Sequence, residues 1–319
     1  MKTREEFEQF YTAELRPKLA ELETQRRRIV RSLLLVSGAC VAVFLIVWLV
    51  VAAQQGPPAV LVFVAIAAVA VVALSAWAMT KEFAPRFKRQ VIEPLVRFID
   101  PGLRYAMIAR IPESRFREGR LFQRPDRYRG DDYVSGKIGE TPIEFSEVHA
   151  EYKTHTHKGQ TQWHTIFWGL YVVADFNKNF RTTTVVVPDV AEQLLGGLGR
   201  MLQKLNFTRP GELVTLEDPE FERRFAVYGE DQVEARYILS PSLMSRIVDF
   251  ADKTGRRIHL SFVRSNVHIA ISFNRSLFEP RLFRSALDPS LVEEYFDDLE
   301  LAVGIVDDFN LNTRIWSKA

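Results

Sequence analysis

The sequence predicts an α+β protein with an N-terminal transmembrane helical hairpin, followed by a cytoplasmic module with mainly antiparallel sheet and packed helices. Two long uncharged apolar runs predict the hairpin, and short segments of alternating apolar and polar residues from Tyr133 onward predict the sheet. We expect four parts: a cytoplasmic amphipathic helix at 1–31, a two-helix transmembrane hairpin at 32–80, a basic juxtamembrane helix and connector at 81–130, and a cytoplasmic α+β domain at 131–319.

Composition limits the choice of partners and chemistry. The chain has 319 residues, 47% of them apolar, which is enough for a sizeable core. Its net charge of +2 gives no argument for nucleic acid, and no recognition motif suggests one. A single cysteine, Cys40, excludes an internal disulfide and a cysteine-rich metal site.

The two apolar runs predict the hairpin. Ser32 to Ala53 and Ala59 to Met79 contain no charged residue, and about 20 apolar helical residues cross about 30 Å of hydrocarbon. The connection, Gln54 to Pro58, is too short for anything but a tight turn. A pair of buried helices in a soluble core is the alternative. Cys40 fits as a small residue inside the first span.

Lysine and arginine predict the orientation of the hairpin. Basic residues precede the first span and follow the second, whereas the turn between the spans has no charge. By the positive-inside rule, both termini and the module after the second span lie in the cytoplasm. The basic residues are Arg26, Arg27, Arg28, Arg31, Lys81, Arg86, Lys88 and Arg89.

Amphipathic helices flank the spans. One apolar stripe precedes the first span, interrupted at Pro17, where we expect a kink or a restart, and another follows the second span. Either the stripes pair as a stalk below the membrane or each lies on the lipid surface. The stripes consist of Phe7, Tyr11, Leu15, Leu19 and Leu22, and of Phe87, Val91, Leu95 and Phe98.

The segment from Arg104 to Arg129 carries eight arginines against three acidic residues. Beside an anionic leaflet each charge is worth about 1 kcal/mol, so Arg115, Arg117, Arg120 and Arg124 are candidates for lipid contact. The alternative is a loosely structured, solvated connector.

Strands and helices alternate in the rest of the chain. Thr165 to Phe176 and Thr182 to Pro188 are β-prone, and a helix is expected from Val190 to Leu205. Ser240 and Pro241 are expected to begin another helix that ends at Gly255. Its expected apolar face consists of Met244, Ile247, Val248 and Ala251.

The charged stretch between Phe225 and Leu239 has two interpretations. Period-two alternation on both sides of a turn at Gly229 to Asp231 predicts two strands, with Tyr237 buried and Glu234 in solvent. A catalytic pair of Asp231 and Glu234 would need a pocket and a partner that the sequence does not identify.

Histidines are the remaining candidates for chemistry. His155, His157 and His164 fall in a polar loop between strands, where they are weak candidates for a zinc or copper site, although a flexible hairpin tip explains them equally simply. His259 and His268 fall on two strands joined by a turn at Arg264-Ser265. We expect His268 to pair with Ser261 and both histidines to lie opposite the core face.

The final helix is acidic. Leu291, Tyr295, Leu299, Ala302 and Val306 predict its buried side, and carboxylates crowd the other side. This acidic face could repel the membrane, bind a basic partner, or complement the arginines of the 104–129 segment.

Several stretches together resemble a known family. They are FSEVHAEY, GLYVVADFNKNF, EDPEFERRFAVYGEDQVEARYILSPSLM, NRSLFEP and NLNTRIW, between about Tyr133 and Trp316. They resemble a bacterial two-span membrane protein family catalogued as domain of unknown function 3137. The resemblance implies a multi-pass protein of the bacterial inner membrane with a cytoplasmic module, but it supplies no catalytic residue.

Three classes of function compete on this evidence. We expect a membrane-anchored binding or scaffold module that acts through an unidentified protein partner, the lipid bilayer and its anionic lipid, without a cofactor. A structural subunit of a larger membrane complex is the alternative. An enzyme is less expected, because the sequence shows no nucleophile–base pair, phosphate loop or strong metal motif.

Overall fold

The computed structural model describes residues 2–155, 159–188 and 210–312. The chain divides into two compact units. The helical unit comprises Lys2–Leu95 and Phe278–Tyr295, and the sheet unit comprises Val96–Leu277 and Phe296–Ala319. The division falls inside two helices, α5 (Glu93–Ile99) and α11 (Pro289–Asp308).

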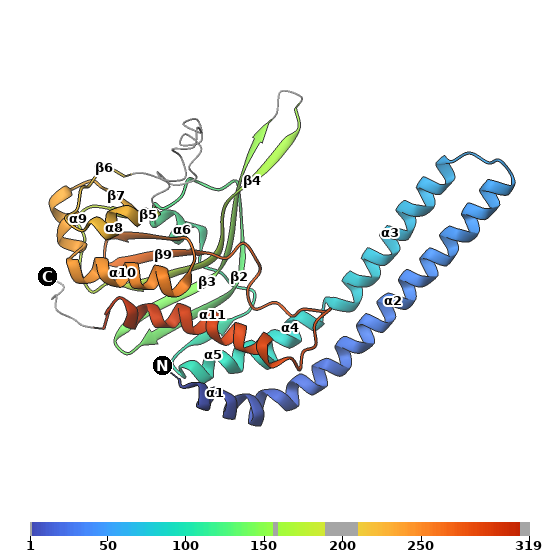
Figure 1. The fold of residues 1–319 in the computed structure, drawn as a ribbon, viewed down its shortest axis with the longest axis horizontal. Coiled ribbons are helices and arrows are strands. Elements are labelled where there is room, and N and C mark those ends of the chain that lie inside the picture. Colours follow the sequence, from blue (N-terminus) through green and yellow to red (C-terminus); the bar gives the residue numbers. More distant parts are fainter. Residues whose placement is uncertain (1, 156–158, 189–209, 313–319) are drawn as a thin grey trace. The chain divides into compact units, whose positions relative to one another are not determined.

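Two long helical segments form most of the helical unit (Figure 1). A kink or a restart was expected at Pro17, which lies in the first turn of α2; the helix instead continues through it and changes from π to α geometry directly before it. The first segment consists of α1 (Arg4–Phe10), the π-helix η1 (Tyr11–Leu15) and α2 (Arg16–Ala53), and the second of α3 (Ala59–Thr80), α4 (Phe83–Phe87), the π-helix η2 (Lys88–Ile92) and α5.

Both segments are long and apolar enough to cross a membrane. The most apolar stretch of each has no buried residue. Leu35, Phe63 and Val69 are 68%, 72% and 70% exposed. The helices α2 and α3 contact each other, and an apolar groove of about 560 Å³ between them is lined by residues such as Cys40 and Phe44.

Outside the apolar stretches, the two segments pack as a stalk. Leu15, Leu19 and Leu22 on one segment and Phe87 and Val91 on the other are buried, and α2 contacts both α4 and η2. An ion pair between Arg86 and Glu21 joins the segments. The predicted stalk is therefore confirmed.

Within the described residues, the sheet unit has nine antiparallel strands in the order β1-β2-β3-β4-β9-β8-β5-β7-β6. The α+β class and the antiparallel sheet are as predicted. The strands are β1 (Arg104–Ala106), β2 (Arg127–Ile138), β3 (Thr141–His155), β4 (Thr161–Asp175), β5 (Thr184–Pro188), β6 (Glu212–Leu213), β7 (Phe225–Gly229), β8 (Ile258–Val263) and β9 (Asn266–Ser272).

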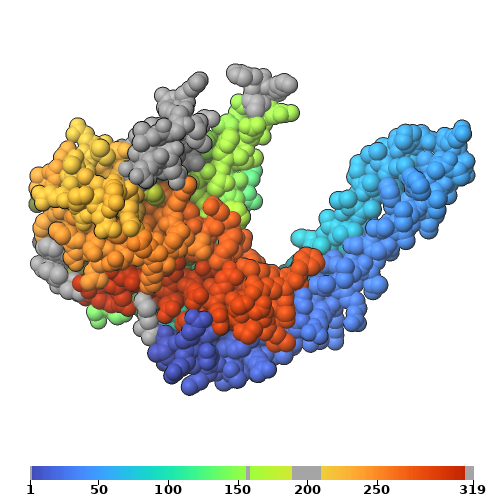
Figure 2. All heavy atoms as spheres, viewed as in Figure 1, coloured from blue at the N-terminus to red at the C-terminus, as the bar shows by residue number. Residues whose placement is uncertain are grey.

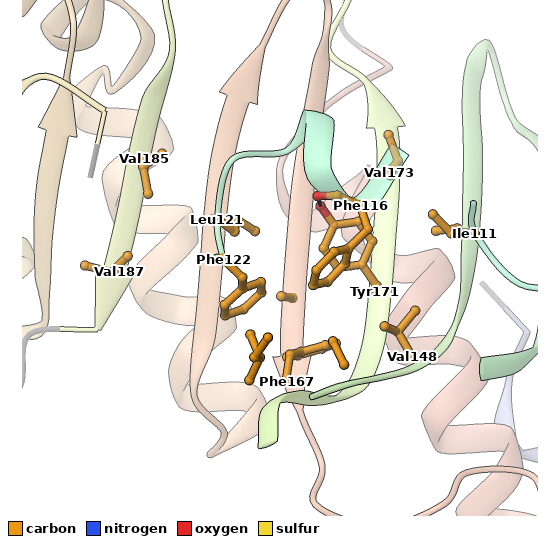
Figure 3. Packing of buried hydrophobic residues seen from close by; sticks show 13 residues of the cluster. Ile111, Phe116, Leu121, Phe122, Val148, Phe167, Tyr171, Val173, Val185 and Val187 are labelled. Atoms are coloured by element: carbon orange, nitrogen blue, oxygen red, sulfur yellow. Dashed lines mark hydrogen bonds between the residues drawn. The ribbon is translucent and has the colours of Figure 1, made fainter. Parts of the chain in front are cut away.

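The 104–129 segment covers one face of this sheet. Phe116 of α6 (Glu113–Glu118) stacks on Phe122 at 5.6 Å and lies 4.9 Å from the Tyr171 ring of β4 (Figure 3). Ile111 and Leu121 are fully buried in the same cluster. The segment is thus a packed layer of the core and not a loose connector, because four apolar side chains are spaced to reach the sheet.

This layer overturns the expected exposure of the two strand histidines. His268 pairs with Ser261 as predicted, but it is fully buried, and His259 is half-buried with its Nδ1 atom shielded from solvent. The prediction assumed one wet face, whereas apolar side chains cover both faces of the sheet. Gly119 makes close packing feasible here, because a Cβ atom on it would stand 2.2 Å from the Tyr171 hydroxyl oxygen.

The charged stretch after β7 was predicted wrongly in its second half. Gln232–Ile238 forms a helix, α9, and not a strand. Asp231 caps it by accepting hydrogen bonds from the backbone N–H groups of Val233 and Glu234. Ala235 and Ile238 are buried at helical spacing, whereas Tyr237 is 50% exposed.

Helices α8 (Pro219–Arg224), α10 (Pro241–Thr254) and the later part of α11 complete the sheet unit. As predicted, Ser240 caps α10 and Gly255 ends it in the left-handed conformation at φ 59°. The apolar side predicted for α11 is buried throughout. The helix expected at Val190 to Leu205 lies outside the described residues.

Candidate functional site

A pocket of about 390 Å³ opens in the sheet unit where segments distant in the sequence meet. It combines apolar walls with three cationic side chains, those of Lys178, Arg236 and Arg246. The other residues that line it are Phe176, Tyr237, Ile238, Ser240, Pro241, Ser242, Leu243, Phe309, Asn310 and Leu311.

Contacts between aromatic rings hold the apolar walls of the pocket in place. Phe176 follows β4 and is held between the rings of Phe180 and Phe262, each 5.4 Å away. Phe309 follows α11 and packs edge-on against Phe250 of α10 at 5.3 Å. The aromatic walls are therefore anchored in the core, so the pocket is formed before any ligand arrives.

Lys178 is a half-buried cation of the pocket, and its ammonium group contacts an aromatic ring. Its Nζ atom lies 3.3 Å from the centre of the Tyr237 ring, a cation–π contact. Burial lowers the pKa of Lys178, and the charge of Glu234 partly opposes this effect. The ammonium group is thus poorly hydrated, which strengthens any contact that it makes with an anion.

The two arginines are held by backbone oxygens. Arg246 donates to the carbonyl oxygen of Asp308 at 3.1 Å and, more weakly, to that of Asp307 at 3.5 Å. Arg236 donates through Nε to the carbonyl of Thr215 at 3.1 Å. Since a guanidinium carries five N–H donors, these contacts orient each arginine while leaving other donors for a ligand.

The first turn of α10 also lines the pocket. The helix dipole places a partial positive charge at this end, which favours an anion. Pro241 has no N–H, and the N–H groups of Leu243 and Met244 are bonded to Ser240, so the charge of the dipole is the main contribution of this turn. Together with the three cationic side chains, this turn makes the pocket suitable for a carboxylate or phosphate attached to an apolar body.

Glu234 stabilises the backbone of a loop near the pocket, at Arg181 and Thr182. Its carboxylate accepts hydrogen bonds from the backbone N–H groups of Arg181 and Thr182 at 3.0 and 2.8 Å, and from the Thr182 hydroxyl at 2.6 Å. Burial raises the pKa of Glu234, but these bonds outweigh it and hold the pKa below its usual value. Glu234 fixes the loop after Lys178, the role of a structural residue and not of a catalytic partner for Asp231, whose carboxylate caps α9.

The four arginines proposed for lipid contact have different environments. Arg115 is paired with Glu118 and Glu144 at 2.9 and 3.0 Å. Arg120 is paired with Glu230 at 2.8 Å although its side chain is 53% exposed. Arg117 and Arg124 are also exposed. Lipid contact by the four stays a prediction.

Acidic residues of α11 pair with basic residues outside the 104–129 segment. Asp298 pairs with Arg275 at 2.7 Å and Asp308 with Lys253 at 2.9 Å. Arg127 and Arg129, at the end of the arginine-rich segment, pair instead with Glu151 of β3.

Of the three histidines considered for a metal site, the two that the structure describes are not brought together. His155 pairs with Thr161 and His164 with Tyr152, so the strand register places the two rings on opposite faces of the β3–β4 hairpin. His164 accepts or donates a hydrogen bond with Thr154 at 2.8 Å and stacks on Tyr152. His157 lies outside the described residues.

The buried His268 and the half-buried His259 belong to the core. The Tyr171 hydroxyl lies 3.2 Å from Nδ1 of His268. Burial lowers the pKa of His268 to about 3 and that of His259 to about 4. Both rings therefore stay neutral in the cell, and neither lines the pocket.

Comparison with known proteins identifies a domain in the second half of the chain. The family model described as "Protein of unknown function (DUF3137)" matches residues 165–311. Residues 165–311 are a DUF3137 domain. A search of the curated proteins found no match.

Among solved structures, this chain is similar to the crystal structure of the mycobacterial trehalose monomycolate transport factor A, TtfA. The two share 8% sequence identity with a TM-score of 0.33, over 66% of this chain and 92% of the other.

The pocket lies wholly within the DUF3137 domain. Its lining draws on three of the stretches that suggested the family: Lys178 lies in GLYVVADFNKNF, Tyr237 in the long central stretch, and Asn310 in NLNTRIW. The sequence reasoning missed this site because it assigned the 233–239 segment to a strand, which would have buried Tyr237.

Proposed function

We propose that this DUF3137 protein is a membrane-anchored binding module of the bacterial inner membrane, with both termini and the sheet unit in the cytoplasm. The exposed apolar surface of α2 and α3 supports the anchor, because a soluble helix with this composition would bury its side chains. The basic residues that precede the first apolar run and follow the second support this orientation.

The pocket is the observation that carries the binding role. Its three cations, helix N-terminus and aromatic walls suit a carboxylate beside an apolar side chain. We propose that the ligand is the C-terminus of a partner polypeptide that ends in an apolar residue. Capture of a terminal carboxylate by positive groups and backbone N–H donors is a recurring mode of peptide recognition. We assign the pocket to binding and not to catalysis.

Calorimetry on the full chain in lipid nanodiscs tests this proposal. The probes are N-acetyl-Ala-Leu-Phe with a free carboxylate, the same peptide as its amide, and 3-phenylpropanoate. We expect the free acid to bind, and Lys178→Gln and Arg236→Gln each to weaken it about tenfold or more, since a hydrogen bond to a charged group contributes about 1.5–3 kcal/mol. The exposed Arg223→Gln is the matched control.

Equal binding of acid and amide, or no binding of either, would refute the carboxylate site. If 3-phenylpropanoate binds as tightly as the peptide acid, the ligand is a small amphiphilic acid, and the polypeptide partner is refuted.

Cysteine labelling tests the anchor and its orientation. In intact cells, a membrane-impermeant thiol reagent should label Gln55→Cys in the turn between α2 and α3. It should label Val233→Cys, a position 75% exposed on α9, only after the membrane is opened. Labelling of Val233→Cys in intact cells would place the pocket outside and contradict the proposed orientation.

A further inference from the structure

A segment without helix or strand crosses the stalk of the helical unit. This segment, Phe278–Asp288, is named the strap here. The Leu287 carbonyl accepts from the Tyr11 hydroxyl at 3.4 Å, and Lys88 of η2 pairs with Glu279 at 2.5 Å. The strap therefore contacts both helical segments, and in the space-filling view its orange-red atoms lie against the blue of α2 (Figure 2).

Two buried charges fix the strap. Glu23 has a side chain only 4% exposed, and it accepts from the backbone N–H of Ala286 at 2.9 Å and from Arg26 and Arg27. The hydrogen bonds from Arg26, the largest cause, lower the pKa of Glu23 to about 2. Lys88 is likewise only 4% exposed in its pair with Glu279. Because buried ion pairs are costly to break, the strap has a defined position on the stalk.

The contacts also give the strap a direction. Leu287 is tied to Tyr11, Ala286 to Glu23, and Leu282 to Arg26, whose Nη1 donates to the Leu282 carbonyl at 2.6 Å. From Leu287 back to Leu282, the strap therefore runs along the first helical segment toward the apolar stretch of α2. The turn at Leu282 and Phe283 is the end nearest the spans.

Arg26 lies six residues before Ser32, where the apolar run begins, which is about 9 Å along a helix. The polar headgroup layer extends roughly 5–7 Å beyond the hydrocarbon on each side. A side chain at the turn of the strap is thus within reach of that layer.

Phe283 occupies this turn, and it is 85% exposed. An exposed aromatic ring on a segment fixed by buried ion pairs is costly in water but favourable at a membrane interface. Exposed cations surround the same end of the stalk and would attract anionic lipid. They are Arg27, Arg28, Arg31, Lys81 and Arg89.

We propose that the strap is an interfacial membrane anchor in which Phe283 inserts among the headgroups of an anionic leaflet. This inference rests on the proposed insertion of α2 and α3 in the membrane. Together the two spans and the ring would hold the stalk at three points instead of two.

Fluorescence quenching in nanodiscs that contain phosphatidylglycerol tests the inference. Single cysteines in the full chain with Cys40→Ala carry an environment-sensitive nitrobenzoxadiazole probe. We expect the probe at Phe283→Cys to shift its emission to the blue and to be quenched more by lipid spin-labelled near the headgroup than by a nitroxide in buffer.

Two further positions make the outcomes distinct. Gln9→Cys is an exposed site about 34 Å before the apolar run along the helix and should be quenched only from buffer. Phe63→Cys, 72% exposed on α3, should be quenched by deeply labelled lipid. If Phe63 responds in this way but Phe283 behaves like Gln9, the strap inference fails and the membrane anchor stands. If Phe63 is not quenched by lipid, both fail.

Discussion

Replacing Glu234 by alanine should destabilise the sheet unit more than replacing the nearby Tyr237 by alanine. The Glu234 carboxylate accepts three hydrogen bonds from Arg181 and Thr182. Tyr237 is 50% exposed and contributes mainly its contact with Lys178. The strand interpretation of the same stretch predicts the reverse order, so the comparison tests the fold of α9 directly.

The magnitudes follow from these contacts. A hydrogen bond to a charged group contributes about 1.5–3 kcal/mol. Because Glu234 is only half-buried, water replaces part of that loss, and we expect Glu234→Ala to cost about 2–4 kcal/mol. Truncating a fully buried aromatic costs about 3–5 kcal/mol, so truncating Tyr237, which is 50% exposed, should cost about half of that, about 1.5–2.5 kcal/mol. Glu217→Ala, at an exposed position, should change stability by less than about 0.5 kcal/mol.

Pulse proteolysis of the full chain in nanodiscs across a urea series measures these differences. With a urea dependence of about 1–3 kcal/mol per molar, Glu234→Ala should lower the midpoint by about 1 M or more. The pKa of Glu234 is held below its usual 4.5, so its stabilisation is present above about pH 4.5 and is lost as the pH falls through the lowered value. The gap between wild type and Glu234→Gln should therefore narrow in acid. A larger loss for Tyr237→Ala than for Glu234→Ala would refute the structure of this segment.

Two further predictions concern the arginine-rich segment. Gly119→Ala should cost about 2–3 kcal/mol of stability in the same assay, because its Cβ atom would stand 2.2 Å from the Tyr171 hydroxyl oxygen and overpacking a core typically costs 1–3 kcal/mol. The control, Ser114→Ala on the exposed side of α6, should leave stability unchanged. Equal effects of the two changes would contradict the packing of this layer. Changing the exposed Arg117 and Arg124 together to Gln should weaken flotation of the full chain, held in uncharged amphipol, with phosphatidylglycerol vesicles at low salt. Low salt is needed because exposed charges are screened over about 8–10 Å. Unchanged flotation would remove these two residues from lipid contact.

The hairpin and stalk could be predicted from sequence because their signals are local. Uncharged runs and helical stripes such as Leu15, Leu19 and Leu22 follow directly from residue spacing. The α10 boundaries were equally accessible, since Ser240 and Gly255 are a typical cap and stop.

The errors arose where two local signals competed. In α9, alternating charged residues suggested a strand, although Asp231 followed three residues later by Glu234 is also a typical helix start. In the 104–129 segment, the many arginines suggested a solvated connector, although the apolar residues Ile111, Phe116 and Leu121 pack on the sheet. The burial of His268 was inaccessible to any local pattern, because it depends on that distant layer.

The pocket could not be predicted because its lining comes from segments separated by more than a hundred residues, such as Lys178 and Asn310. Only the tertiary fold places these side chains together. The family-like stretches marked the right segments, but no spacing within one of them showed that they meet.

The ends of the nine-stranded sheet bear on self-association. In the part of the chain that the structure describes, the outermost strands are β1 with three residues and β6 with two. An outer strand offers its unpaired backbone groups as a template for another chain, and such short strands offer few. Proteins confined to a membrane surface meet one another often, so a long open edge would promote fibre-like stacking of neighbouring copies. Both outer strands are too short to seed it, whereas residues 161–167 of β4, which pair with β3 but not with β9, leave a longer backbone edge at which two copies could meet.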